Sequence, residues 1–158
     1  MDLFSQGAIA AALPLATRQR QQTAMAAFIG FCSGLVPDLD ILIRSEDDTL
    51  LALEFHRQFT HSLIFIPFGS AVLAIIFHRL LAGKAQISFL EAWLFCGTGL
   101  ATHGLLDAAT SYGTMLFWPF SSAPITLNIV SIIDPLFTAP VTIFVITGVV
   151  LKDGRWGC

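Results

Sequence analysis

The sequence contains few charged residues. They make up 12% of its 158 residues, and the formal net charge is −3, whereas soluble domains have about a quarter charged residues. With no excess of positive charge, the chain lacks a basic face that would hold nucleic-acid phosphates. Hydrophobic residues make up 55% of the chain, and the mean hydropathy is +0.76. We therefore expect an integral membrane protein with no nucleic-acid partner.

Several familiar motifs are also missing. The three cysteines, Cys32, Cys96 and Cys158, are isolated, so their spacing predicts neither a zinc knuckle nor a redox motif. There is no internal repeat, low-complexity tract, glycine-rich phosphate loop or serine nucleophile motif. At the N-terminus an acidic residue precedes the apolar stretch and arginines follow it, the reverse of a secretory signal, so we expect this segment to be retained. A single domain over residues 1–158 is expected at this length.

Three long apolar stretches remain, and each is about the length that crosses a bilayer, about 20 residues. They are residues 62–82, which follow the possible helix caps Thr60 and Ser62; 88–108, which open with Ser88 and Glu91 in capping-box spacing; and 134–152, which begin with Asp-Pro. Residues 7–16 and 23–43 are predicted to be shorter helices packed against these spans. The expected fold is all-α: a polytopic membrane helical bundle.

The distribution of lysine and arginine predicts the orientation of the bundle. Six of these residues fall on one side of the predicted spans, which we assign to the cytoplasm: Arg18, Arg20, Arg79, Lys84, Lys152 and Arg155. The other two, Arg44 and Arg57, fall on the opposite, periplasmic side. Because the 62–82 and 88–108 helices are joined by only five residues, they should run antiparallel, with His61 close to His103 and Asp107. Residues 109–133 are predicted to form a re-entrant or interfacial lid at the same face.

Polar residues gather at that predicted periplasmic end. His103 and Asp107 are four residues apart, so they lie on one face of a helix. His56 can converge with His61 only if it lies in the loop before the helix. Asp38 and Asp40 follow Pro37, which favours a turn in which short carboxylates can reach an ion. The stretch "EFHRQFTHSLIFIP" includes Glu54 and Arg57 as well.

A divalent metal would explain this cluster. Burying one carboxylate near the bilayer costs on the order of 2.5–3.5 kcal/mol, so several of them need a compensating cation. Mixed imidazole and carboxylate ligands suit zinc, manganese or iron, and zinc is expected first. Outside the cluster, Asp134 is either a ligand or a helix cap, His78 is expected to be an interfacial residue of the cytoplasmic end, and the acidic residues Glu46, Asp47 and Asp48 are expected to be solvated.

Five segments in order resemble the YdjM-type family of bacterial inner-membrane metal-dependent hydrolases. They are "MDLFSQ", "GLVPDLD", "HRQFTHSLIFIP", "THGLLDAATSYGTMLFWPFS" and "SIIDPLFTAP". This family is distantly similar to zinc-dependent phospholipases C and single-strand-specific nucleases. The resemblance implies a metal site, with Arg57 beside it, made of Asp38, Asp40, His56, His61, His103 and Asp107. Many members have histidine in place of Gln6, and many are longer, so we expect this chain to be a short member or a truncated product.

The leading functional hypothesis is metal-assisted hydrolysis of a phosphoester or other amphiphilic substrate, in the bilayer of a bacterial inner membrane. Asp40 or Asp38 would act as general base, and Arg57 would stabilise developing negative charge. One alternative is an ion- or proton-coupled transporter, although the helix centres carry no ionisable group. The other is a non-catalytic membrane module that has a structural metal and binds a protein partner.

Overall fold

The structure, a computed structural model, describes residues 1–17, 22–43, 56–81 and 87–152. Over these residues the fold is all-helical, as predicted. The elements in chain order are α1 (Leu3–Thr17), α2 (Thr23–Leu35), the 3-10 helices η2 (Pro37–Leu42) and η3 (Phe59–His61), α4 (Phe65–Leu81), α5 (Phe89–Ala109) and α6 (Pro135–Lys152). An isolated antiparallel bridge between Thr114 and Ile125 is the one strand-like pairing in the described chain.

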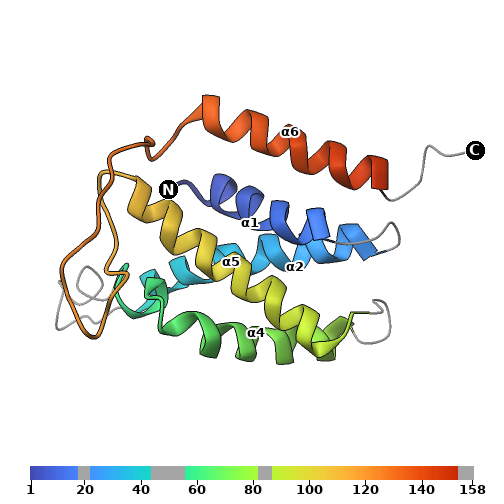
Figure 1. Ribbon diagram of the computed structural model, residues 1–158, viewed down its shortest axis with the longest axis horizontal. Coiled ribbons are helices and arrows are strands. Elements are labelled where there is room, and N and C mark those ends of the chain that lie inside the picture. The colour runs from blue at the N-terminus through green and yellow to red at the C-terminus, as the bar shows by residue number, and fades with distance from the viewer. Residues whose placement is uncertain (18–21, 44–55, 82–86, 153–158) are drawn as a thin grey trace, which may run out of the picture.

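The helices form a bundle in which α5 packs against α1, α2 and α4, while α6 lies on the outside against α1 (Figure 1). Helices α4 and α5 run antiparallel, as the short connection between them predicts (Figure 1). The C-terminal end of α5, the N-terminus and the long 110–134 segment lie at the same end of the bundle, on the left of Figure 1. That end also holds η2 and η3, so four separate parts of the sequence meet there: the N-terminus, η2, η3, and the end of α5 with the segment that follows it.

The capping box predicted at the start of α5 is present. Ser88 is the N-cap residue: its Oγ accepts from the Glu91 backbone N–H at 3.3 Å, and Glu91 Oε2 accepts from the Ser88 backbone N–H at 2.8 Å. Such a cap stabilises a helix by about 1 kcal/mol. Helix α4, in contrast, begins at Phe65, three residues later than predicted. The reason is that Ser62 has an extended backbone and its hydroxyl closes η3 by donating to the Phe59 carbonyl.

Glycines allow α1, α2 and α5 to pack closely. A Cβ atom on Gly30 would lie 2.5 Å from the Ala10 carbonyl oxygen, and one on Gly34 would lie 2.5 Å from Ala10 Cβ. From the other side, a Cβ atom on Gly99 of α5 would lie 2.7 Å from Ser33 Cβ. Small residues four apart on one helix face are typical of helix packing inside membranes. Here Gly30 and Gly34 bring α2 close to α1, and Gly99 brings α5 against the backbone of α2.

One helical stretch of the described chain, Thr23–Leu42, is both long and apolar enough to cross a membrane. It combines α2 with η2, because the chain continues as a 3-10 helix after Pro37 and adds Leu39, Ile41 and Leu42 to the apolar length. The sequence pattern predicts a short packed helix over this stretch, so the added apolar length of η2 is a finding of the structure. Helices α1, α4 and α6 are apolar but shorter.

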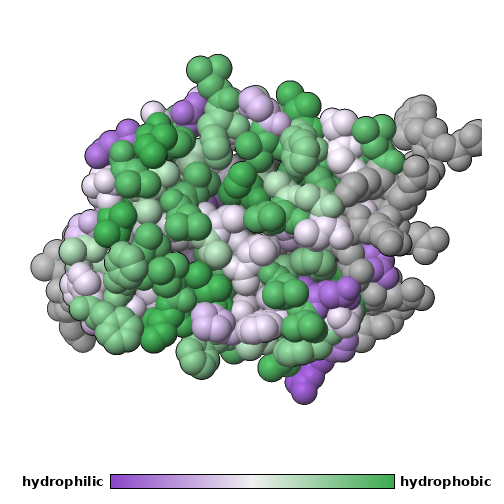
Figure 2. Space-filling view, in the orientation of Figure 1, coloured by the Kyte–Doolittle hydropathy of each residue, from purple (hydrophilic) through white to green (hydrophobic). Residues whose placement is uncertain are grey.

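Large apolar side chains cover much of the described surface. Phe68 and Leu80 of α4 are 69% and 72% exposed, and Leu136 of α6 is 89% exposed. Figure 2 shows apolar residues spread over most of one face, with few hydrophilic ones among them. Extended apolar surfaces of this kind mark a membrane or a protein partner.

Some sequence predictions fall outside the described residues. These are the loop charges at Arg18, Arg20, Arg44, Lys84 and Arg155, the acidic residues Glu46, Asp47, Asp48 and Glu54, and the cysteine at Cys158.

Candidate metal centre

The site lies where the last turns of α5 meet α2, η2 and η3. His103 and Asp107 are one turn apart on α5, as their spacing predicts, and both side chains are fully buried. His61, the last residue of η3, is 2% exposed and faces them. Gly104 permits this approach, because a Cβ atom there would lie 2.8 Å from the His61 carbonyl oxygen. The predicted convergence of His61, His103 and Asp107 is therefore present.

Asp38 and Asp40 point to different partners from η2. Asp38 Oδ1 lies 3.3 Å from His103 Nε2 and 3.6 Å from His61 Nε2. Asp40 turns instead toward the loop before η3, where its Oδ1 lies 2.7 Å from His56 Nδ1. The turn after Pro37 thus places one carboxylate in the centre and the other beside it.

The orientation of the His103 ring follows from the close packing of α2 and α5. His103 Nδ1 lies 2.6 Å from the carbonyl oxygen of Gly34. A carbonyl oxygen only accepts hydrogen bonds, so Nδ1 is the donor and carries the hydrogen. In the neutral ring Nε2 is then a bare acceptor, and it points at His61 Nε2, 2.9 Å away. Two ring nitrogens this close either share one hydrogen, which the His61 ring donates to His103, or bind a common metal ion.

The spacing of the four central side chains fits a metal ion. Asp38, His61, His103 and Asp107 each offer one ligand atom, and the four atoms all lie within 4.8 Å of one another. At metal–ligand distances of about 2.0–2.2 Å, ligands of a tetrahedral ion lie about 3.4 Å apart. The two Nε2 atoms lie 2.9 Å apart. Asp38 Oδ1 lies 3.3 Å from Nε2 of His103 and 3.6 Å from Nε2 of His61. Asp107 Oδ2 lies 3.8 Å from Nε2 of His103 and 3.4 Å from Nε2 of His61.

Two buried oxygen atoms at this end also have no hydrogen-bond donor among the described residues. They are Asp107 Oδ2 and Gln6 Oε1. Buried polar atoms are nearly always satisfied, so such exceptions call for a cation or water. The other Asp107 oxygen, Oδ1, accepts from the Gln6 amide at 2.8 Å and from the amino group of Met1. The sequence predicts neither contact of Asp107, since neither residue type indicates a carboxylate partner.

The electrostatic setting of His61 favours positive charge. Burial by itself lowers the pKa of His61, but the carboxylates of Asp107 and Asp38 outweigh it and raise the pKa above its ordinary value. A metal ion at this position would meet the same negative field.

Arg57 is held beside the centre in an uncommon backbone conformation, with φ of 64°. Its backbone N–H donates to Asp40 Oδ2 at 3.1 Å, and its carbonyl accepts from the Met115 N–H at 3.2 Å. The guanidinium Nε lies 3.5 Å from Asp107 Oδ2, and its carbon lies 5.2 Å from the centre of the Tyr112 ring. A strained residue fixed from several sides is typical of a functional position.

The remaining predicted site residues separate from the centre. His56 lies in the loop before η3, as predicted, and pairs with Asp40 rather than joining the four-atom group. Asp134 caps α6, because its Oδ1 accepts from the Leu136 and Phe137 N–H groups. Of the two readings left open for Asp134, the structure shows the cap. His78 lies at the far end of α4, against the Phe89 ring at 6.2 Å.

Residues 110–134 cover this end of the bundle without forming a helix. Leu127 and Ile129 donate to the carbonyls of Ala108 and Ala109 at the end of α5, both at 2.8 Å. Leu116 accepts from the Leu63 N–H at 2.9 Å, which ties the segment to the start of α4. The segment therefore lies where the predicted lid was expected.

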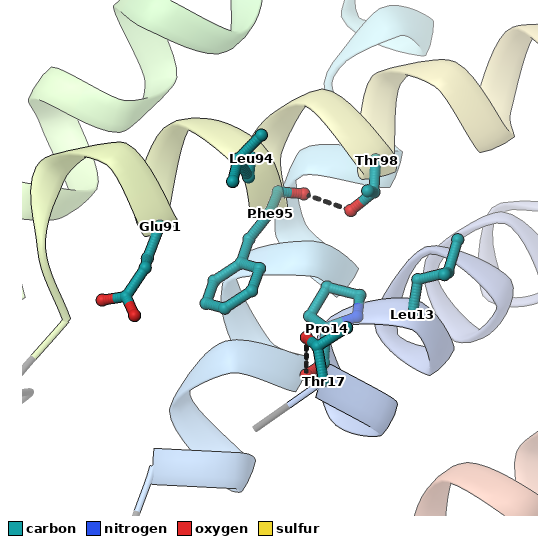
Figure 3. A pocket seen from close by; sticks show the side chains of 7 residues that line it. All are labelled: Leu13, Pro14, Thr17, Glu91, Leu94, Phe95 and Thr98. Atoms are coloured by element: carbon teal, nitrogen blue, oxygen red, sulfur yellow. Dashed lines mark hydrogen bonds between the residues drawn. The ribbon is translucent and has the colours of Figure 1, made fainter. Parts of the chain in front are cut away.

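A separate cavity of about 360 Å³ lies between α1 and the first half of α5 (Figure 3). Leu94 and Phe95 of α5 and Leu13 and Pro14 of α1 form most of its wall, with Thr17, Glu91 and Thr98. None of the predicted site residues lines it.

Comparison with known proteins places the chain among inner membrane proteins. A family model described as the YdjM inner membrane protein matches residues 1–158. Inner membrane protein YbcI of Escherichia coli (strain K12) is 31% identical over 96 residues, which are 60% of this chain and 53% of YbcI. The uncharacterized protein YfhP of Bacillus subtilis (strain 168) is 28% identical over 99 residues, 63% of this chain and 29% of YfhP. The chain thus matches about half of one relative and under a third of the other. No solved structure matches.

Proposed function

The chain belongs to the YdjM inner membrane protein family, and from this premise we propose that it is a multi-pass membrane-bound, metal-dependent hydrolase. Asp38, His61, His103 and Asp107 would hold the ion, with zinc the first candidate and manganese or iron the others. The observation that supports this most strongly is the 2.9 Å approach of two buried imidazole Nε2 atoms between two carboxylates. When bound, such an ion lowers the pKa of a coordinated water and polarises the bond under attack.

The surrounding residues have separate proposed roles. His56 and Asp40, joined at 2.7 Å, form the pair that accepts the proton of the attacking water, with Asp40 holding the His56 ring. Arg57, already beside Asp107, binds and neutralises the anionic part of the substrate. A phosphoester, on a lipid or another amphiphile, is the substrate class that suits a cationic side chain beside a metal at a membrane face.

The proposed topology follows the charge distribution of the loops. Helices α4 and α6 lie within the predicted spans 62–82 and 134–152, and α5 covers the predicted span 88–108 from its second residue and ends one residue beyond it. The centre would then face the periplasm, below the 110–134 segment, in a single domain covering residues 1–158. The apolar exposed surfaces of α4 and α6 support contact with lipid.

A hydrolysis assay tests the proposed reaction. Purified full-length protein in detergent is incubated with soluble phosphomonoesters, phosphodiesters and a glycerophospholipid in mixed micelles. Turnover of one class, removed by chelator and restored by added metal, is expected. His103→Ala should abolish it, and the matched control His78→Ala at the far end of α4 should not.

The same material separates the alternatives. Metal that stays bound without turnover of any substrate would favour a structural metal in a non-catalytic module. Metal-dependent uptake of an ion into proteoliposomes, without hydrolysis, would favour a transporter.

A further inference from the structure

We propose that Thr60 is a positioning residue of the metal centre, because its hydroxyl group fixes which nitrogen of His61 is free to bind the ion. Asp40 acts on the centre through this hydroxyl group rather than as a ligand. The inference rests on the proposed metal centre and assigns a role to a residue outside the ligand group.

The hydrogen-bond geometry around Thr60 leaves one arrangement. Thr60 Oγ1 lies 2.8 Å from Asp40 Oδ2 and 2.9 Å from His61 Nδ1. An ionised carboxylate only accepts, so the single hydroxyl hydrogen of Thr60 points to Asp40. Thr60 Oγ1 must then accept from His61, and the hydrogen of the neutral ring lies on Nδ1. His61 Nε2, which faces His103 and the carboxylates of the centre, is therefore left with its lone pair free.

The Asp40 carboxylate takes part in a relay, the chain of hydrogen bonds Asp40–Thr60–His61, and it also contacts His56 and Arg57. Its Oδ1 lies 2.7 Å from His56 Nδ1, and its Oδ2 accepts from the Thr60 hydroxyl and, at 3.1 Å, from the Arg57 N–H. The direct separation from Asp40 Oδ2 to His61 Nδ1 is 3.5 Å, beyond a good hydrogen bond. Asp40 is 3% exposed, so water does not replace these contacts readily. The path from this carboxylate to the ring of His61 therefore runs through Thr60.

In many metal sites, residues that do not bind the metal make hydrogen bonds to the residues that do, and the relay has this role. A ligating histidine usually donates its second N–H to a fixed acceptor, which sets the ring orientation and raises its basicity. His103 has the same arrangement, with the Gly34 carbonyl as acceptor. Loss of such a contact typically weakens metal affinity by about 10–100-fold.

Two substitutions at Thr60 test the relay in the full-length protein. Thr60→Val keeps the shape and removes the hydroxyl group, and Thr60→Ser keeps the hydroxyl group. Zn²⁺ affinity, measured by competition with a chromophoric chelator, should fall about 10–100-fold in Thr60→Val and stay near the original value in Thr60→Ser. Thr142→Val is the matched control, since the Thr142 hydroxyl donates only within α6, to the Thr138 carbonyl. Equal affinity in Thr60→Val and the unaltered protein would overturn the inference.

A second measurement uses the unaltered protein and so does not depend on whether a variant folds. In protein labelled with ¹⁵N-histidine and loaded with Zn²⁺, His61 should show a protonated Nδ1 and a metal-bound Nε2 by NMR. Metal bound through Nδ1 of His61 would overturn the inference while leaving the metal centre intact. If the unaltered protein binds no Zn²⁺, Mn²⁺ or Fe²⁺ at all, the proposed function itself fails.

Discussion

His61 and His103 are 42 residues apart in the sequence, yet their Nε2 atoms lie 2.9 Å from each other in the buried end of the bundle. This contact depends on Gly104, where α5 meets the His61 backbone, and on the Gly34 carbonyl, which orients the His103 ring. Two imidazoles and two carboxylates are thereby arranged at separations that suit one metal ion.

Asp107 should be the most sensitive carboxylate of the centre. Its Oδ2 faces the two histidines, and its Oδ1 accepts from Gln6. Asp107→Asn replaces a charged ligand with a neutral one. Metal affinity should therefore fall further than it does when a residue that only contacts a ligand is lost, for which the typical decrease is about 10–100-fold. Asp134→Asn, at the cap of α6, is the matched control and should leave metal affinity unchanged. Isothermal titration of both variants gives the comparison, and equal losses would contradict this role for Asp107.

Close packing of α5 on α2 should depend on Gly99. A Cβ atom there would lie 2.9 Å from the Gly30 carbonyl oxygen and 3.0 Å from the Gly34 backbone nitrogen. Gly99→Ala should therefore destabilise the fold by about 1–3 kcal/mol, because backbone must move. Gly97→Ala on the same helix is the control. Its Cβ would lie 3.8 Å from Ser70, so it should be neutral or stabilising by up to about 1 kcal/mol. Thermal unfolding in detergent compares the two, and equal effects would contradict the packing argument.

Metal binding should weaken on acidification. The pKa of His61 lies above its ordinary value of about 6.5, so near pH 6 a metal ion must displace a proton from this ring. Apparent affinity should rise as the pH increases through the raised pKa. The stability of the metal-free protein should change in the opposite direction. The free energy of folding that His61 gains from the carboxylates is present below about pH 6.5 and is lost as the pH rises through the pKa of His61 in the folded protein.

Melting temperatures with and without metal, from about pH 6 to about pH 8.5, measure both trends. The advantage of the metal-loaded protein over the metal-free one should widen as pH rises. A constant difference would show that His61 loses no proton when metal binds.

The proposed orientation can be tested by cysteine labelling. In a variant without native cysteines, Ser111→Cys lies at the metal end of the bundle and Ser88→Cys at the opposite end, and both positions are exposed. A membrane-impermeant maleimide should label position 111 and not position 88 in intact spheroplasts. The reverse pattern would place the centre on the cytoplasmic side.

Much of the bundle could be predicted from local sequence. Ser88 and Glu91 identify the start of α5, and the short connection before them predicts the antiparallel pair that brings His61 to His103. These features are predictable because each depends on neighbouring residues or on chain length. The sequence leaves Asp134 ambiguous, because an Asp-Pro pair suits a ligand and a cap equally, and the backbone contacts show that it is a cap.

Other features depend on contacts between distant segments. The partnership of Asp40 with His56 and Thr60, instead of the central group, follows from the way η2 turns after Pro37. The contact of His103 with the Gly34 carbonyl requires the close packing of α2 and α5. Every residue has a carbonyl group, so the sequence does not indicate which one accepts this hydrogen bond. The positive φ of Arg57 is likewise unexpected for a long side chain.

Metal content is the most direct test of the central claim. The full-length protein is purified in detergent and examined by elemental analysis, beside the double variant His61→Ala, His103→Ala and the control His78→Ala. We predict one tightly bound transition metal ion per chain in the unaltered protein and in the His78→Ala control, and none in the double variant. Metal retained by the double variant, or absent from all three proteins, would contradict the account.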